Sequence, residues 1–220
     1  MSEHLFIADI LRRMPDLVTE CSENRETVIR NLLICHGLIQ PSDGVPDCDD
    51  WMQTFTGKKF FPLNPNIDDI DIDDIAHGLS NICRFNGQSK FFYSVAQHAV
   101  LVSRLCKKHP RQGLHHDDPE AFLTDIVRPV KKKMPAYKAA EAVLWRVIAK
   151  KFDLPFELDP EVHQADQIAL MTEKRDVMSL CVHKWALEDH YQPSDIRIVP
   201  MTPMEAKQAF LDRYYELASN

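Results

Sequence analysis

The spacing of apolar residues constrains the fold of this chain more than any other feature of its sequence. In the stretch "YSVAQHAVLVSRL", Val95, His98, Val102 and Leu105 follow one another at steps of three, four and three residues. Residues spaced in this way lie on one face of an α-helix. The chain has only six glycines in 220 residues, and apolar and polar residues do not alternate as they do in strands. The sequence therefore predicts an all-α fold.

Capping signals mark the starts of several helices. Ser94 and Thr202 each precede a glutamine or glutamate by three residues, which is the spacing of a capping box. The pair Asp159-Pro160 predicts another start, because proline loses nothing in the first turn of a helix. Residues 139–152 repeat the apolar spacing and predict a core helix, with Ala140, Val143, Leu144, Val147 and Ile148 on its apolar face.

The N-terminal part differs from the rest. Residues 4–14 and 25–35 have helix-like spacing, and "GLIQPSDGVPDCDD" at 37–50 has the composition of a linker. We therefore expect a small helical extension of unknown role over 1–49 and the main domain over 50–220.

Two segments follow the predicted linker. Residues 55–65 are irregular and fit a short hairpin, and residues 68–74 are strongly acidic. The acidic run fits either a cation-binding loop or the start of the helix that follows. Acidic side chains at a helix start interact favourably with the helix dipole, so the second interpretation is favoured.

Composition excludes several classes of protein. A net charge of -7 and a pI near 5.8 argue against nucleic acid as a partner. The six cysteines form no C-x-x-C pair, so neither a disulfide scaffold nor a thiolate zinc site is indicated, and a cytoplasmic location fits best. No signal peptide or membrane-spanning stretch is predicted.

Histidine and aspartate residues form a candidate site for a divalent metal ion. His98, the adjacent His116 and Asp117, and the distant Asp166 supply imidazole and carboxylate ligands. A lone histidine on an apolar helix face is usually a core residue. The presence of the His-Asp pair at 116–117 makes metal binding the favoured interpretation of His98. Glu120 follows Asp117 by three residues and lies on the same helix face, where its carboxylate can orient a water.

The order His, His-Asp, Asp resembles that of the HD-domain metal-dependent phosphohydrolase superfamily. Within it, "HDDPEAFLTDIVRPVK" is similar to the bacterial 5'-deoxynucleotidase-like branch, whose motif is matched by Glu120, Asp125, Pro129 and Lys131. The stretch "AHGLSNICRFNGQ" supplies Arg84 as the basic residue expected upstream. The resemblance covers roughly residues 50–217 and implies a helical bundle of the HD-domain type.

The resemblance also implies a function. It points to a phosphohydrolase that acts on nucleotides, removing the 5'-phosphate of deoxyribonucleoside monophosphates. One divalent ion (Mn, Co, Mg, Fe, Ni or Zn) would bind His98, His116, Asp117 and Asp166. Glu120 and Asp125 would be catalytic, with Asp125 near the sugar or the leaving oxygen. Arg84 would contact phosphate, whereas Lys131 either does the same or belongs to a solvated basic patch. A homo-oligomer is a further expectation.

The chain departs from the family pattern around its His-Asp pair. His115 stands where an apolar residue is usual, and Asp118-Pro119 replaces small residues. We expect His115 to contact the substrate or a metal ligand, with direct metal ligation as the alternative. Because proline is tolerated only in the first turn of a helix, we also expect this helix to begin near Leu114 or His115, as Gly113 would permit.

Two other functions stay open. A deoxynucleoside triphosphate triphosphohydrolase would need a larger basic pocket, for which only Arg128 and residues 131–133 are candidates. A non-catalytic nucleotide-sensing or partner-binding module would use residues 1–49 for docking.

Overall fold

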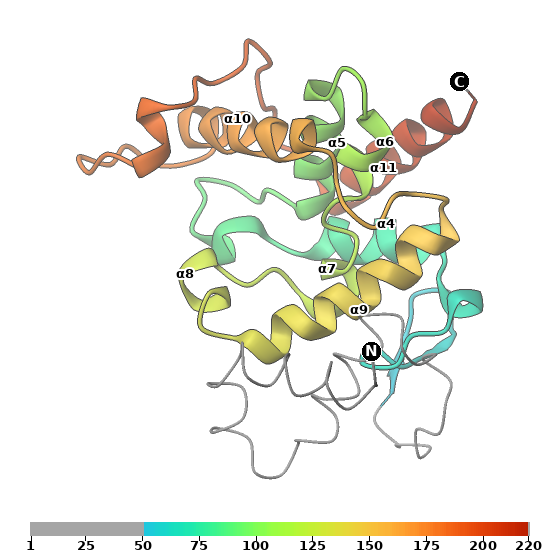
Figure 1. The fold of residues 1–220 in the computed structure, drawn as a ribbon. Helices are drawn as coiled ribbons and strands as arrows, with labels where there is room; N and C mark the ends of the chain where they lie inside the picture. Colours follow the sequence, from blue (N-terminus) through green and yellow to red (C-terminus); the bar gives the residue numbers. More distant parts are fainter. Residues whose placement is uncertain (1–50, 220) are drawn as a thin grey trace, which may run out of the picture.

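The computed structural model describes residues 51–219, and the predicted extension over 1–49 lies outside this range. Helices dominate the described part (Figure 1). The elements, in chain order, are β1 (Met52–Gln53), β2 (Lys59–Phe60), η1 (Ile67–Asp69), α4 (Ile72–Asn81), η2 (Arg84–Gly87), α5 (Val95–Leu105), α6 (Pro110–His115), α7 (Glu120–Leu123), α8 (Arg128–Lys131), α9 (Pro135–Lys151), α10 (Pro160–Asp176), η3 (Ala186–Asp189) and α11 (Pro203–Ala218).

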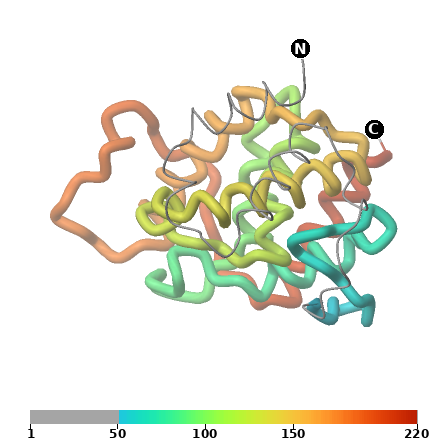
Figure 2. Tube along the Cα trace, turned by 60° about the horizontal axis from the view of Figure 1, so that its bottom comes forward, coloured from blue at the N-terminus to red at the C-terminus, as the bar shows by residue number. Residues whose placement is uncertain are grey.

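The all-α prediction is confirmed, since the described residues form only one sheet, of two short strands. None of the helices in the described part combines the length and the apolarity needed to cross a bilayer. Helix α5 lies at the centre, and α4, α6, α10 and α11 all pack against it (Figures 1 and 2). The apolar face of α5 is therefore covered by helices from both ends of the described chain.

The three predicted helix starts at Ser94, Asp159 and Thr202 are confirmed. The Ser94 hydroxyl accepts a hydrogen bond from the backbone N–H of Gln97 at 3.1 Å. The Gln97 side chain does not return to Ser94, because its amide donates to the carbonyl of Val199 at 2.6 Å. This bond ties the start of α5 to the segment that leads into α11.

The predicted hairpin is present, and it begins slightly earlier than expected. Strands β1 and β2 pair antiparallel, with Met52 opposite Phe60. The acidic run starts a helix, as favoured, because Asp71 caps α4 by accepting from the N–H of Asp73 at 3.0 Å. Asp74 accepts from the N–H of Thr56 at 2.7 Å and so holds the hairpin against α4.

The predicted core helix over 139–152 is confirmed as α9, which starts earlier, at Pro135. Four of the five residues predicted for its apolar face are buried, namely Ala140, Val143, Leu144 and Ile148. The fifth, Val147, is partly buried against the same cluster. In Figure 2, α9 crosses the body of the protein and leads through a loop into α10.

The expected late start of the helix at the His-Asp pair is wrong. Helix α6 starts at Pro110 and ends at His115, and a separate short helix, α7, begins at Glu120. Pro119 lies between them, where its missing N–H interrupts no helical hydrogen bond. Gly113 serves a different purpose, since a Cβ there would lie 2.8 Å from the sulfur of Cys106. It lets α6 approach the end of α5 closely.

Gly78 permits a similar close approach between α4 and α7. A Cβ on Gly78 would lie 2.7 Å from the carbonyl oxygen of Ala121. We expect Gly78→Ala to lower the free energy of unfolding by about 1–3 kcal/mol, because overpacking outweighs the gain in helix propensity. Urea denaturation measures this, with the exposed Asn81→Ala on the same helix as control. Equal or higher stability of Gly78→Ala would show that α7 moves away without cost.

Candidate metal centre

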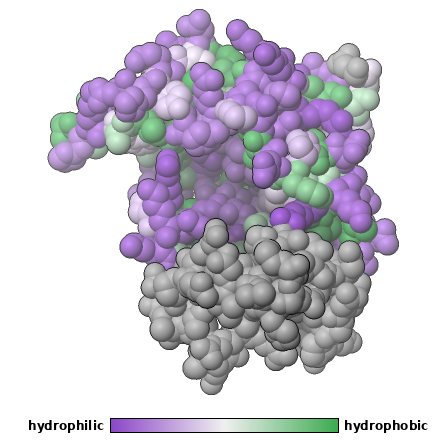
Figure 3. All heavy atoms as spheres, in the orientation of Figure 1, coloured by the Kyte–Doolittle hydropathy of each residue, from purple (hydrophilic) through white to green (hydrophobic). Residues whose placement is uncertain are grey.

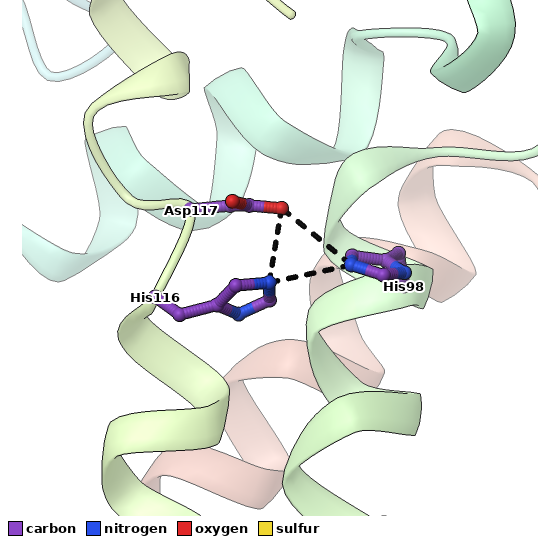
Figure 4. Close-up of side chains that lie close together, drawn as sticks. All are labelled: His98, His116 and Asp117. Atoms are coloured by element: carbon purple, nitrogen blue, oxygen red, sulfur yellow. Dashed lines mark hydrogen bonds and ion pairs between the residues drawn. The ribbon is translucent and has the colours of Figure 1, made fainter. Parts of the chain in front are cut away.

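Three side chains from two helices meet at the candidate metal centre. His98 is the fourth residue of α5, whereas His116 and Asp117 follow the last residue of α6 (Figure 4). The Nε2 atoms of His98 and His116 are 3.3 Å apart. The Asp117 Oδ2 atom is 3.2 Å from His116 Nε2 and 3.6 Å from His98 Nε2. Within the described residues, these three could hold a metal ion.

The fourth predicted ligand lies at the edge of this group. Asp166 comes from α10, and its Oδ1 atom is 3.3 Å from His98 Nε2. Its other oxygen, Oδ2, accepts a hydrogen bond from the neighbouring Gln167 amide at 2.9 Å. The structure thus brings all four predicted ligands to one place, with Asp166 joined to the others through His98.

The outer nitrogens of both histidines fix which way their lone pairs point. His98 Nδ1 lies 2.5 Å from a carboxylate oxygen of Glu173, and His116 Nδ1 lies 2.9 Å from the carbonyl of Gly113. These oxygens accept, so each Nδ1 carries a proton, and each Nε2 has a lone pair for a metal ion once it has lost its own proton. Metal-binding histidines generally have outer partners of this kind.

This arrangement fits a metal ion. In the metal-free protein a proton on His116 Nε2 can be shared with Asp117 or His98, and a bound metal ion would take the place of that proton. Two nitrogens at about 2.1 Å from one tetrahedral ion are themselves about 3.3–3.4 Å apart. The separation of His98 and His116 therefore suits a shared ion, and the Asp117 carboxylate supplies a negative charge next to both.

The charges at the centre support each other. Burial alone would lower the pKa of His116, but the adjacent Asp117 carboxylate outweighs it and raises this pKa to about 9. Burial would raise the pKa of Asp117, yet His116, His98 and Arg84 hold it well below its usual range. Burial likewise opposes ionisation of Asp166, whose pKa falls to about 2 beside His98. The carboxylates are thus ionised at neutral pH.

Arg84 reaches the centre from η2. Its guanidinium lies 3.3 Å from Glu173 and 3.7 Å from Asp117. The next two residues, Phe85 and Asn86, have φ angles of 55° and 51°, a left-handed conformation that is rare for phenylalanine. The backbone of Arg84 is held before this bend by its N–H, which donates to the carbonyl of Tyr93 at 2.9 Å.

Glu173 is the important residue that the sequence reasoning missed. It is fully buried on α10 and contacts both His98 and Arg84 through separate oxygens. Its position seven residues after Asp166 corresponds to two helical turns on the same face, which is a signal that the sequence contains. Arg84 and His98 each pair with one oxygen of Glu173, which offsets the cost of burying this carboxylate.

Glu120 and Lys131 form a second group beside the centre. Glu120 begins α7 and is buried, and its Oε1 atom is 3.3 Å from the Lys131 ammonium. Its other oxygen, Oε2, is buried without a hydrogen-bond partner in the described part of the chain. Burial and the charges of Asp117 and Asp125 raise the pKa of Glu120 well above its usual range. Lys131 also pairs with Glu141 at 2.5 Å.

Asp125 is partly buried after α7. Burial raises its pKa, and the charge of Asp117 adds to this effect, whereas Arg84 opposes it. Asp125 is therefore electrostatically connected to the centre, although it is not among the residues that meet there. On the face shown in Figure 3, mostly hydrophilic residues surround a hollow between the region of α10 and that of α8 and α9.

His115 lies elsewhere. Its ring is 1% exposed and stacks on Phe152, with centroids 4.9 Å apart, while the edges of Phe210 and Tyr214 close the other sides. Its Nδ1 atom is 2.5 Å from Asp118 Oδ2. The expected contact between His115 and a substrate is therefore wrong, because the aromatic core encloses the ring.

Comparison with known proteins identifies relatives. No protein-family model matches the chain. Over 170 residues it is 39% identical to YfdR, an uncharacterized protein of Escherichia coli (strain K12), and the match covers 76% of this chain and 96% of YfdR. It is also 35% identical over 130 residues to an uncharacterized protein of Rhodobacter capsulatus, covering 54% of this chain and 66% of that protein. Because the first match spans nearly all of YfdR at this level of identity, the chain belongs to the YfdR family.

Proposed function

We propose that the protein is a metal-dependent phosphohydrolase that removes the 5'-phosphate of deoxyribonucleoside monophosphates. The observation that carries this proposal is the convergence of two imidazole Nε2 atoms and the Asp117 carboxylate, with Glu120 electrostatically linked to Asp117. The resemblance of the motif residues to HD-domain phosphohydrolases supports the same reaction class. The substrate class rests on that resemblance.

The metal site would use His98, His116 and Asp117, together with Asp166. A divalent ion bound there would polarise a phosphoryl oxygen and make a water molecule more acidic. The Nδ1 contacts to Glu173 and Gly113 hold both imidazoles so that Nε2 faces inward. The chain thus provides a pre-formed set of ligands, which lowers the cost of binding.

The remaining residues have roles that follow from their positions. Glu120 has one buried oxygen without a partner among residues 51–219 and can take a proton from the attacking water. Arg84 can neutralise negative charge on the transferred phosphoryl group, although Glu173 and Asp117 already attract it. Lys131 is held by Glu120 and Glu141, so a phosphate would have to compete with these carboxylates. Asp125 would contact the sugar or the leaving oxygen.

The test is phosphate release from a panel of nucleotides. The purified protein is stripped with a chelator, reloaded with Mn²⁺, Co²⁺ or Mg²⁺, and given deoxy- and ribonucleoside monophosphates and deoxynucleoside triphosphates. We expect inorganic phosphate and nucleoside from the deoxymonophosphates, only after reloading. Intact triphosphate from the triphosphates would instead identify a triphosphohydrolase. Metal binding without turnover on any nucleotide would favour a binding module.

A further inference from the structure

A tight turn carries two of the three residues of the metal centre. The N–H of Asp118 donates to the carbonyl of His115 at 3.1 Å, which closes a four-residue turn. His116 and Asp117 are its two central residues, and His116 has φ -63° and ψ -27°, as expected for the first central position of a type I turn. The directions of both side chains therefore depend on how well this turn is fixed.

The α-helical hydrogen-bond pattern is interrupted at this turn. In a continuous helix, the N–H of residue 119 would donate to the carbonyl of His115, but Pro119 has no N–H. The His115 carbonyl pairs with Asp118 instead, and α7 begins only at Glu120. The turn thus lies between two short helices, where i→i+3 bonds, such as that from the N–H of Glu120 to the carbonyl of Asp117 at 2.9 Å, replace the regular i→i+4 bonds.

A second bond closes the same turn through side chains. His115 Nδ1 lies 2.5 Å from Asp118 Oδ2, and both side chains are almost completely buried. The His115 ring is packed on Phe152 and against Phe210 and Tyr214. This contact joins the first and last residues of the turn and anchors them to the aromatic core formed with α11.

Asp118 depends on this bond. Its Oδ2 atom is paired with His115, whereas its Oδ1 atom is buried without a partner in the described part of the chain. A buried carboxylate is costly unless it is paired. A costly arrangement of this kind persists only where the surrounding structure holds it in place. Because Asp118 directly follows the His-Asp pair, we infer that it is kept to hold the turn that carries His116 and Asp117.

We propose that His115 and Asp118 form a side-chain clamp that positions His116 and Asp117 for metal binding. The inference rests on the proposed metal centre and adds two positioning residues to it. They stand where this chain departs from the HD-domain pattern, which usually has an apolar residue before the pair and a small residue after it. The clamp touches neither the ion nor the substrate, and it acts through the backbone of the turn.

Two replacements of His115 separate hydrogen bonding from packing. His115→Asn keeps an N–H donor close to the position of Nδ1 and loses the ring stacked on Phe152. His115→Phe keeps a stacked ring and loses the donor. Asp118→Ala removes the acceptor, and Asp74→Ala is its matched control, since Asp74 is also buried and hydrogen-bonded but lies at the hairpin.

The readout is Co²⁺ affinity and the visible absorption spectrum of the bound Co²⁺, measured by titrating the metal-free proteins. We expect His115→Phe and Asp118→Ala to bind Co²⁺ about 10–100-fold more weakly, with an altered spectrum. His115→Asn should stay within a few-fold of the parent despite a lower melting temperature. The double variant His115→Phe/Asp118→Ala should be no weaker than the weaker single one, because both remove the same bond. Asp74→Ala should lose stability only.

Other outcomes would overturn the clamp. Parental Co²⁺ affinity and spectrum in folded His115→Phe and Asp118→Ala would show that the pair only packs the core. Weak binding by His115→Asn with normal binding by His115→Phe would assign the effect to the aromatic ring. If the parent itself bound no Co²⁺, the metal centre and the clamp would both fail, which distinguishes failure of the proposed function from failure of the clamp alone.

Discussion

Replacing Asp117 with alanine should lower metal affinity by more than about 100-fold, beyond the loss caused by removing an outer partner of a ligand. Asp117 lies within ion-pair distance of His116, His98 and Arg84 together. Without its carboxylate, the two imidazoles lack the negative charge that favours a cation between them. Phosphate release should fall to the background rate at metal concentrations that saturate the parent.

The metal-free variant offers a second readout. Asp117 is the main group that raises the pKa of His116, whereas burial lowers it. In Asp117→Ala only Asp166 would remain as a nearby carboxylate that opposes burial, so the pKa of His116 should fall from about 9. NMR titration of the imidazole protons measures this shift. Asp212→Ala, an exposed change on α11, is the control for both measurements. Near-parental metal binding by folded Asp117→Ala would remove Asp117 from the ligand set.

Local signals in the sequence predict the helices well. Ser94, Asp159 and Thr202 cap helices because short polar side chains reach the free N–H groups of the first turn. The face of α9 could be predicted because burial follows the helical period. These features depend on neighbours within one or two turns, so a single sequence contains what is needed. The packing of α4, α6, α10 and α11 around α5 does not depend on such short-range signals.

Only part of the metal centre could be predicted from the sequence. The order of His98, His116, Asp117 and Asp166 along the chain predicted a group that the structure brings together. The break after His115 was not predicted, because Pro119 permits either a late helix start or two short helices, and the sequence alone does not distinguish them.

Two outer partners required knowledge of tertiary structure. Glu173 was missed because its importance comes from Arg84, 89 residues away in the sequence. The surroundings of His115 were missed for the same reason, since Phe152 and Phe210 come from distant parts of the chain. A helical period shows that a residue faces inward, but it does not show what that residue meets.

Replacing Glu120 with glutamine should lower kcat by about 10²–10⁴-fold, the range attributed to general acid–base groups. Glutamine keeps the shape of the side chain and one carbonyl oxygen for Lys131, but it cannot accept a proton from water at neutral pH. Glu120 is not among the residues that meet at the metal centre, so Co²⁺ affinity should stay within a few-fold of the parent. Metal titration and steady-state phosphate release test these two expectations separately.

Glu141→Gln is the matched control, because Glu141 shares Lys131 with Glu120 but has no part in the proposed proton transfer. If Glu120 acts as the base, Glu141→Gln retains most of the turnover, whereas Glu120→Gln loses it. Equal losses in both variants would mean that the position of Lys131, rather than the carboxylate of Glu120, limits the reaction. Full turnover by Glu120→Gln would exclude Glu120 as the proton acceptor, and Asp125, whose pKa is also raised by burial, would become the next candidate.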